Sequence, residues 1–181
     1  MNIERAQAID GGMNDLELEW LAEKASTRER VAEIGSLRGR SARAMADNMA
    51  KGSILICVDH FKGSEEHGDA FSLDDGLYRT FCANMHDHII EGRVLVMPYP
   101  SIDASARIER LFGPVLDMVF IDASHDYDSV KADIQAWQPL LKLGGLLCGH
   151  DYGHPPIERV VRELFPHKHR PVPGGSIWEV L

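Results

Sequence analysis

The sequence has few of the features that would assign it to an extracellular, membrane or metal-finger class of protein. Its three cysteines, Cys57, Cys82 and Cys148, form no C-x-x-C pair, so neither a disulfide framework nor a zinc finger is expected. No apolar run approaches the roughly 20 residues that a membrane-spanning helix needs. The charged start, MNIERAQAIDGG, lacks the apolar stretch of a signal peptide. These absences predict a cytoplasmic protein without a membrane partner.

Basic residues are also scarce. Lysine and arginine number 19 and aspartate and glutamate 28, which gives a net charge of −9. Such an acidic surface repels phosphate backbones, so a nucleic-acid partner is not expected. The length of 181 residues and the apolar fraction of 44% suit one compact domain over residues 1–181 with a full core.

Strand-like and helix-like patterns alternate along the chain, which predicts an α/β fold in which helices cover a mostly parallel sheet. After a loose start over residues 1–13, the expected helices are 14–26, 41–50, 73–90 and 101–111, one that stops near Pro139, and one that opens at Pro155. The expected strands are 31–36, 53–61, 93–98, 115–122 and 145–150, with a polar loop over residues 62–72. Residues 167–181 read as a closing hairpin around Pro-Gly-Gly.

The first strand ends in a glycine turn, 33-EIGSLRGRS-41. Ligands of an open parallel sheet lie beyond the carboxyl ends of its strands, so this turn is a candidate ligand site. Gly35 permits a tight turn, Gly39 lets backbone approach a ligand, and Ser41 can cap the next helix. Asp59 ends the second strand, where its carboxylate can accept both hydroxyls of a ribose.

Three interpretations of the glycine turn remain open. Gly35 and Gly39 can simply form a turn, with Asp59 solvated. A nicotinamide-dependent oxidoreductase would have G-x-G-x-x-G, whereas these two glycines are separated by three residues. Glu33 is unfavourable beside a pyrophosphate and suits a ligand with a positive amino group. That combination favours S-adenosylmethionine, which has a ribose, an α-amino acid and a sulfonium but no phosphate.

The sequence resembles the class I S-adenosylmethionine-dependent methyltransferases, and among them the small bacterial group related to sugar and antibiotic O-methyltransferases. The matching segments are 31-VAEIGSLRGRS-41, 56-ICVDHFKGSEEH-67, 81-FCAN-84 and 118-MVFIDASHDYDSVKADIQAWQPLLKLGGLLCGHDY-152. They occur in the family's order and span most of residues 15–181. Residues 98–100, Pro-Tyr-Pro, depart from the family's usual small polar pair, and little chain precedes the first helix.

The resemblance implies a Rossmann-like three-layer fold, whose seven-stranded sheet has an antiparallel last strand, and S-adenosylmethionine as cofactor. It implies a small-molecule acceptor and a cofactor site formed by the turn with Glu33, Gly35, Ser36, Gly39 and Ser41, by Asp59 at the ribose, by the neighbouring His60, by Ser101 near the adenine, and by Asp122 at the reaction centre.

A second group of polar residues lies where the fourth and fifth strands end. Asp122 ends the fourth strand and His150-Asp151 end the fifth, and these neighbouring strands should bring the three side chains together. Methyl transfer to a hydroxyl also requires loss of its proton, to a base or by way of a metal. His125, near the start of the next helix, is the expected base because the helix dipole keeps its imidazole neutral. His150 is the alternative base.

Asp122, His150 and Asp151 could instead bind a divalent metal. Asp151 suits Mg²⁺, whereas His150 favours a softer ion. Two further alternatives stay open, namely a non-catalytic nucleoside-binding module and a homodimer that shields the apolar face of helix 14–26. Asp126 and Asp128 are expected only to cap the helix that follows His125.

Overall fold

The computed structural model describes residues 1–63 and 76–181. Its helices are α1 (Glu4–Gln7), α2 (Asp15–Ser26), α3 (Arg40–Asn48), α4 (Gly76–Asn84), α5 (His86–Ile90), α6 (Ser101–Phe112), α7 (Tyr127–Trp137), the 3₁₀ turn η2 (Gln138–Leu140) and α8 (Pro155–Leu164). Its strands are β1 (Arg30–Ile34), β2 (Ile54–Val58), β3 (Val94–Met97), β4 (Leu116–Ile121), β5 (Leu141–Gly149), β6 (His169–Pro171) and β7 (Trp178–Val180).

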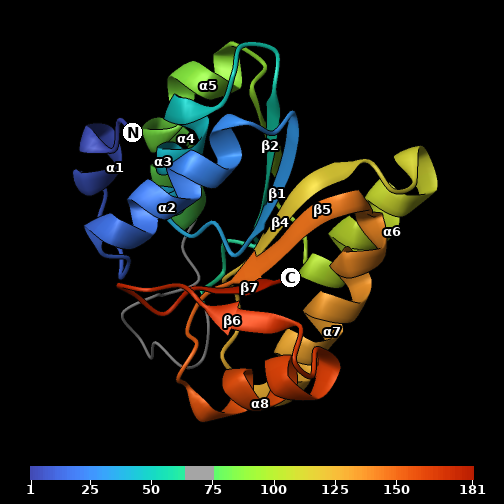
Figure 1. Cartoon of the computed structure of the whole chain (residues 1–181). Coiled ribbons are helices and arrows are strands. Elements are labelled where there is room, and N and C mark those ends of the chain that lie inside the picture. Colours follow the sequence, from blue (N-terminus) through green and yellow to red (C-terminus); the bar gives the residue numbers. More distant parts are fainter. Residues whose placement is uncertain (64–75) are drawn as a thin grey trace.

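The strands form one seven-stranded sheet in the order β3-β2-β1-β4-β5-β7-β6 (Figure 1). The first five strands in this order, β3, β2, β1, β4 and β5, are parallel to one another. The strand β7 runs antiparallel to both β5 and β6. The predicted α/β class with an antiparallel last strand is therefore confirmed. The chain order reverses beside β1, where the connections from β1 and β4 leave in opposite directions, and such a point is the usual ligand crevice of an open parallel sheet.

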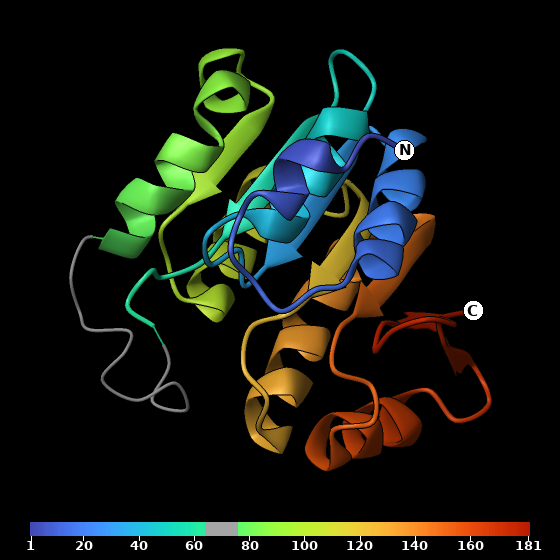
Figure 2. The same ribbon diagram turned by 90° about the vertical axis from the view of Figure 1, so that its left-hand side faces the viewer.

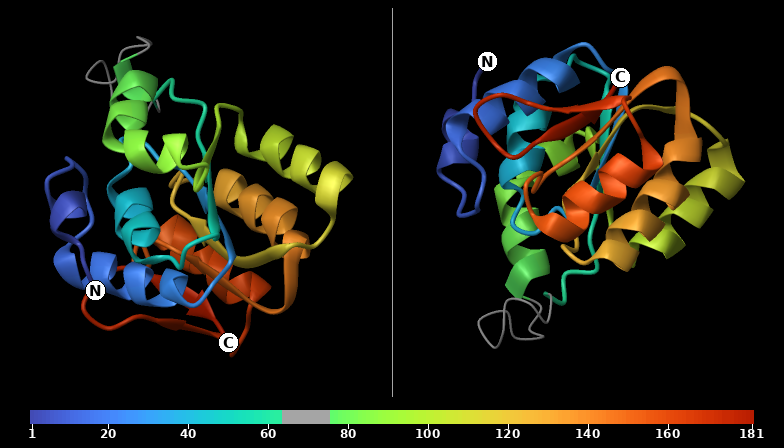
Figure 3. Two further views of the ribbon diagram at one scale, coloured as in Figure 1. Left: turned by 90° about the horizontal axis from the view of Figure 1, so that it is seen from above. Right: turned by 60° about the horizontal axis from the view of Figure 1, so that its bottom comes forward.

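Helices cover both faces of the sheet, α1 to α5 on one face and α6 to α8 on the other (Figures 1 and 3). The central strands β1 and β4 are largely buried on both faces, so most of their residues are apolar. Alternate residues of β1 show this: Val31 belongs to the core beneath α2 and α3, and Ala32 and Ile34 to the core beneath α6, α7 and α8. Only Glu33 interrupts the pattern of buried apolar residues in this strand.

The helix α2 begins as the sequence predicts. The Asn14 side chain accepts a hydrogen bond from Glu17 N–H, and the Glu17 carboxylate accepts one from Asn14 N–H, which forms a capping box. The apolar face of α2 is buried inside the chain, mainly against α3 (Figure 2). The apolar face of α2 therefore needs no second subunit to cover it, and the homodimer stays a prediction.

Two local expectations differ from the structure. The helix expected over 73–90 is divided at Met85 into α4 and α5, and after the break His88 Nε2 reaches Asp47 Oδ1 at 2.7 Å. Its first residues and most of the polar loop expected over 62–72 lie outside the described residues. Ser41 is not the cap of α3, because that helix already begins at Arg40 and Gly39, in the left-handed conformation, is its N-cap.

The carboxyl-terminal hairpin forms as predicted, with the proline-containing β6 at the sheet edge. Trp178 of β7 packs against Gly149, where an added Cβ would lie 2.4 Å from the indole. The hairpin is thereby attached to the end of β5. Within the described residues, no helix combines the length and the apolar character that crossing a membrane would require.

Candidate active site

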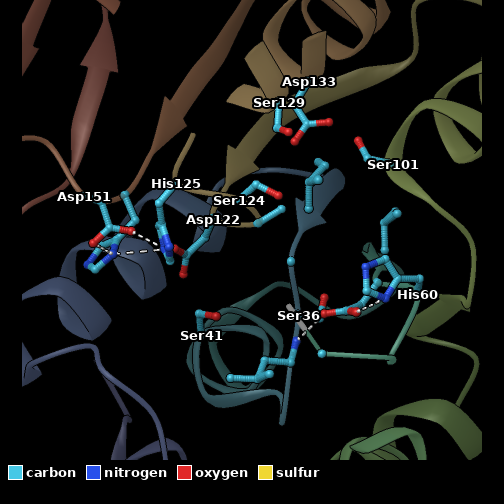
Figure 4. Close-up of a pocket in the computed structure, with 18 of the residues that line it drawn as sticks. Ser36, Ser41, His60, Ser101, Asp122, Ser124, His125, Ser129, Asp133 and Asp151 are labelled. Atoms are coloured by element: carbon cyan, nitrogen blue, oxygen red, sulfur yellow. Dashed lines mark hydrogen bonds and ion pairs between the residues drawn. The ribbon is translucent and has the colours of Figure 1, made fainter. Parts of the chain in front are cut away.

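A cavity of about 530 Å³ lies beyond the carboxyl ends of β1, β2 and β4. Its walls come from the loops that follow these strands, from the loop between β3 and α6, from α7, from the end of β5 and from residues 10–13. Figure 4 shows Asp122, His125 and Asp151 at one end of the cavity and Ser101, Ser129 and Asp133 at the other. Predicted site residues that line it are Gly35, Ser36, Ser41, Asp59, His60, Ser101, Asp122, His125, His150 and Asp151.

The turn after β1 requires glycine at position 35 because the chain passes very close to the next strand. Gly35 has φ +93°, and an added Cβ would lie 2.1 Å from the Asp122 carbonyl oxygen. The backbone also joins the strands here, since Asp122 N–H donates to the Ile34 carbonyl at 2.8 Å. Gly35 thus places the β1 turn directly beside Asp122.

Glu33 lies beneath this turn and is fully buried. Its Oε1 accepts a 2.5 Å hydrogen bond from Ser41 Oγ, whereas neither its Oε2 nor Ser36 Oγ has a partner among the described residues. Burial raises the pKa of Glu33 to about 7, although the nearby Ser36 hydroxyl and the hydrogen bond from Ser41 lower it. Glu33 Oε2 and Ser36 Oγ are therefore two buried polar atoms without a hydrogen bond to the described residues. The predicted contact of Glu33 with an amino group stays a prediction.

Gly39 has a different surrounding from the one expected. It has φ +89°, and an added Cβ would lie 3.2 Å from the Phe81 ring and 3.3 Å from Met85 Cγ. The residues that line the cavity do not include Gly39, which is the N-cap of α3, and its predicted contact with the cofactor stays a prediction. The sequence could not show these neighbours of Gly39, because Phe81 and Met85 lie more than 40 residues further along the chain.

Asp59 binds the backbone of two loops. Its Oδ2 accepts from Leu37 N–H at 2.9 Å and its Oδ1 from Phe61 N–H at 2.6 Å. A carboxylate has about four acceptor sites, so acceptor capacity remains toward the cavity that Asp59 lines. The neighbouring His60 also lines the cavity, and its Nδ1 accepts from Lys62 N–H.

Ser101 and Asp133 form the far end of the cavity. Trp137 Nε1 donates to Ser101 Oγ at 2.8 Å, which fixes the hydroxyl against α7. Burial raises the pKa of Asp133 to about 6, against a hydrogen bond from Ser101 that lowers it. Ser101 was predicted here, and Asp133 was not. The sequence does indicate that Asp133 is buried. It lies three residues after the buried Val130 and four before the buried Trp137, and this spacing places the acid on the apolar face of a helix.

Asp122, His150 and Asp151 meet where β4 and β5 end, as the sequence predicts. His150 Nδ1 lies 3.5 Å from Asp122 Oδ1 and 3.2 Å from Asp151 Oδ1. Burial raises the pKa of Asp122 to about 7, and the nearby His150 opposes the rise. Asp151 has φ +61°, and hydrogen bonds from His125 and His150 outweigh burial and hold the pKa of its carboxyl well below the usual range.

His150 has acceptors at both ring nitrogens. Its Nε2 donates to Glu17 Oε1 at 3.0 Å and to Ser176 Oγ at 2.9 Å, while Nδ1 faces the two carboxylates. Burial lowers the pKa of His150, but hydrogen bonds to Asp151 and Glu17 outweigh it and raise the pKa to about 10. These contacts favour the protonated form of His150, and the base and metal-ligand roles predicted for His150 stay predictions.

His125 lines the cavity and contacts the Asp151 carboxylate. Its Nε2 lies 3.0 Å from Asp151 Oδ2, and its side chain is partly exposed (Figure 4). Ligand atoms of Asp122, His125 and Asp151 lie within 4.8 Å of one another, so these three could hold a metal ion. The candidate metal set in the structure therefore contains His125, whereas the set predicted from the sequence contained His150. Asp126 accepts from Ser129 N–H at 2.9 Å and caps α7, as expected.

The segment 10–13 is a wall that the sequence did not predict. Arg40 binds it from α3 by donating to the carbonyl oxygens of Gln7, Ile9 and Met13 at 3.0, 2.6 and 3.1 Å. The start expected to be loose is therefore folded over the cavity. The sequence gives only a weak indication of this wall, since an arginine at the start of a helix does not show which carbonyl groups it binds.

Comparison with known proteins identifies the family. A sequence model of the methyltransferase domain family matches residues 32–152. The O-methyltransferase TomG of Streptomyces achromogenes, in complex with S-adenosylmethionine, has a TM-score of 0.70 at 12% identity, covering 94% of this chain and 81% of TomG. An O-methyltransferase of Bacillus cereus, in complex with S-adenosylhomocysteine, has a TM-score of 0.69 at 19% identity, covering 97% and 86%.

A putative caffeoyl-CoA O-methyltransferase of Staphylococcus aureus has a TM-score of 0.72 at 14% identity, covering 99% of this chain and 91% of that one. At these identities the structures show a shared fold, whereas the family match extends over most of the chain, from β1 to the end of β5. The chain therefore belongs to the methyltransferase domain family, and the resemblance to class I methyltransferases predicted from the sequence is confirmed.

Proposed function

We propose that this enzyme transfers a methyl group from S-adenosylmethionine to a hydroxyl of a small molecule. The observation that carries the proposal is the cavity itself, which is lined by Asp59 and has the pair of His125 and Asp151 at one end. Solved structures of the same fold hold S-adenosylmethionine or S-adenosylhomocysteine, as TomG and the Bacillus cereus enzyme do.

The residues around the cavity suit this cofactor. Asp59 has acceptor capacity for ribose hydroxyls. Glu33 Oε2 and Ser36 Oγ are buried without partners next to the Gly35 turn, where an amino group or a water attached to it would satisfy them. Asp122 adds a carboxylate at the end where the cationic sulfonium belongs. No basic cluster for a pyrophosphate is needed.

S-adenosylmethionine, when bound, supplies a methyl group on a positively charged sulfur. The protein must then hold the acceptor oxygen in line with that methyl group and remove the hydroxyl proton. His125 is the proposed base. The carboxylate of Asp151 orients the imidazole and stabilises the imidazolium that forms when His125 takes the proton. The protonated His150 keeps Asp151 in place from the other side.

The proposal is tested by incubating the enzyme with methyl-labelled S-adenosylmethionine and a panel of sugars and phenols. We expect label on a hydroxyl oxygen of at least one acceptor. His125→Gln should lower kcat by about 10²- to 10⁴-fold, the usual contribution of a general base. Its affinity for S-adenosylhomocysteine should stay unchanged, as should both quantities in His86→Gln, which alters an exposed histidine of α5. Equal kcat values for the wild type and His125→Gln would remove His125 as the base.

A divalent metal is the second candidate for the same end of the cavity. Asp122, His125 and Asp151 offer two carboxylates and one imidazole, a donor set that suits a transition metal such as Mn²⁺ better than Mg²⁺. When bound, the metal would lower the pKa of the acceptor hydroxyl. Activity that survives dialysis against a chelator supports His125 as base. Activity that is lost and then restored by Mn²⁺ supports the metal.

The two remaining alternatives are weaker. A nicotinamide-dependent oxidoreductase is not favoured, because the chain belongs to a methyltransferase family. A non-catalytic nucleoside-binding module would bind S-adenosylhomocysteine equally well before and after replacement of His125 and would label no acceptor. The cytoplasmic location predicted from the sequence and the absence of a nucleic-acid partner stay predictions.

A further inference from the structure

Glu17 is a buried acid of α2 that is not among the residues lining the cavity. The main chain fixes both oxygens of its carboxylate, since Oε1 accepts from Ser176 N–H at 2.6 Å and Oε2 accepts from Asn14 N–H at 2.9 Å. Burial raises the pKa of Glu17, but hydrogen bonds from His150, Ser176 and Asn14 outweigh it and lower the pKa to about 2. Glu17 is therefore an ionised acceptor at pH 7, and the backbone of two distant segments defines its position.

The carboxylate of Glu17 is connected to His125 through two further side chains. Glu17 Oε1 accepts from His150 Nε2 at 3.0 Å, and the other ring nitrogen, Nδ1, lies 3.2 Å from Asp151 Oδ1. The second oxygen of that carboxylate, Asp151 Oδ2, lies 3.0 Å from His125 Nε2 (Figure 4). Acids and histidines thus alternate in an unbroken row of contacts from α2 to the cavity.

Asp151 is the member of this row that most needs support. It has φ +61°, a left-handed conformation that is uncommon for residues other than glycine, and its side chain is partly exposed. Such a side chain keeps one direction only when another group holds it. Here that group is His150, whose ring is fixed at Nε2 by Glu17 and by Ser176 Oγ at 2.9 Å.

We propose that Glu17 is a positioning residue for methyl transfer, which orients the His150 ring so that Asp151 holds His125 toward the acceptor hydroxyl. This inference rests on the proposed function, because it takes His125 to be the base. A misplacement of about 1 Å, caused by a change away from the reacting atoms, can cost about 10²-fold in rate. Removing the support should therefore lower kcat, whereas cofactor affinity should stay unchanged because Glu17 does not line the cavity.

The capping box of α2 offers a matched pair of variants for the test. Glu17→Gln keeps the size of the side chain, but its amide cannot accept hydrogen bonds at both ends. Asn14→Ala removes the side chain that accepts from Glu17 N–H and leaves the contact between Glu17 and His150 in place. Both are assayed with methyl-labelled S-adenosylmethionine and the sugar or phenol of the panel above that the wild type methylates fastest.

The two variants should differ in kcat. We expect Glu17→Gln to lower kcat by about 10- to 100-fold with unchanged affinity for S-adenosylhomocysteine, and Asn14→Ala to keep kcat within about twofold. Combination with His125→Gln shows whether Glu17 acts through His125. If it does, Glu17→Gln should lower the residual rate of His125→Gln by less than about twofold, because no base is left to orient. A reduction by the same factor in both backgrounds overturns the inference and leaves Glu17 a structural residue.

A measurement on the wild type does not depend on the folding of any variant. In protein labelled with ¹⁵N on histidine, the Nε2–H of His150 should give an NMR signal protected from exchange with water at pH 7, because a buried carboxylate accepts it. Exchange as fast as that of the exposed His86 overturns the inference.

The outcomes also separate this inference from the proposed function. A wild type that methylates a hydroxyl, with equal kcat in Glu17→Gln and Asn14→Ala, overturns the role of Glu17 alone. A wild type that methylates no member of the panel overturns the proposed function together with this inference.

Discussion

The ionised carboxylate of Glu17, which is buried beside His150, should contribute about 3 kcal/mol to the free energy of unfolding at pH 7. Glu17 Oε1 accepts from His150 Nε2, from Ser176 N–H at 2.6 Å and from Ser176 Oγ. Burial raises the pKa of Glu17, but the hydrogen bonds from His150, Ser176 and Asn14 outweigh it and lower the pKa from 4.5 to about 2. That shift corresponds to roughly 3.4 kcal/mol at 1.36 kcal/mol per unit. The shift of Glu17 includes the hydrogen bonds from Ser176 and Asn14 as well as the contact with His150, so this free energy belongs to the whole set of contacts of the Glu17 carboxylate.

Glu17→Gln preserves the shape of the side chain but removes its charge. We expect it to lower the free energy of unfolding by about 3 kcal/mol and Tm by about 6–12 °C at pH 7. Because the folded pKa of Glu17 is depressed, its stabilisation is present above pH 4.5 and is lost as the pH falls toward 2. At pH 3 the difference should shrink to about 1.4 kcal/mol. The raised pKa of His150 acts in the opposite direction, since its stabilisation is full below pH 6.5 and is lost as the pH rises toward 10.

The assay is urea unfolding of the wild type and Glu17→Gln at pH 3, 7 and 9. Glu19→Gln on the exposed side of the same helix is the matched control and should change stability by less than about 0.5 kcal/mol. An effect of Glu17→Gln that equals the control, or that is the same at pH 3 and pH 7, would refute the reasoning.

Two further predictions concern the cavity walls. Gly35→Ala should destabilise the protein by about 3 kcal/mol or more in urea unfolding, since it combines a left-handed φ with a clash against the Asp122 carbonyl group. Gly52→Ala has a similar φ of +91° but no atom within 4 Å, so an equal loss there would show that the clash is irrelevant. Arg40→Ala should speed amide exchange in residues 6–13 about tenfold, because it removes hydrogen bonds of a charged group. Unchanged exchange would show that Arg40 does not hold this segment.

Much of the site could be predicted because it depends on strand order alone. Parallel strands end at the same edge of a sheet, so the residues that follow neighbouring strands must meet there. Asp122, His150 and Asp151 came together for that reason. The same logic placed Asp59 and Ser101 around one cavity. The alternation of strands and helices, together with the closing hairpin, was sufficient for the fold class.

The remaining features depend on contacts between segments that are distant in the sequence. His150 was assigned a catalytic or metal role because its position in the sheet was known but its neighbours were not. Glu17 lies 133 residues earlier and Ser176 lies 26 residues later, and together with the carboxylates they occupy both ring nitrogens. Gly39 likewise was assigned to the ligand because the sequence does not show that Phe81 lies beside it. Asp133 was missed because a helical acid is ordinarily solvated, and only its apolar neighbours in the helix indicated otherwise.

Calorimetry with S-adenosylhomocysteine on the wild type and Asp59→Asn tests most directly whether the cavity holds this nucleoside. Asparagine can still accept from the backbone N–H groups that Asp59 binds, but it loses the charge that strengthens hydrogen bonds to ribose hydroxyls. The account predicts measurable binding by the wild type and affinity lower by about tenfold or more in Asp59→Asn. Absence of binding at about 1 mM ligand, or the same affinity in both proteins, would contradict it.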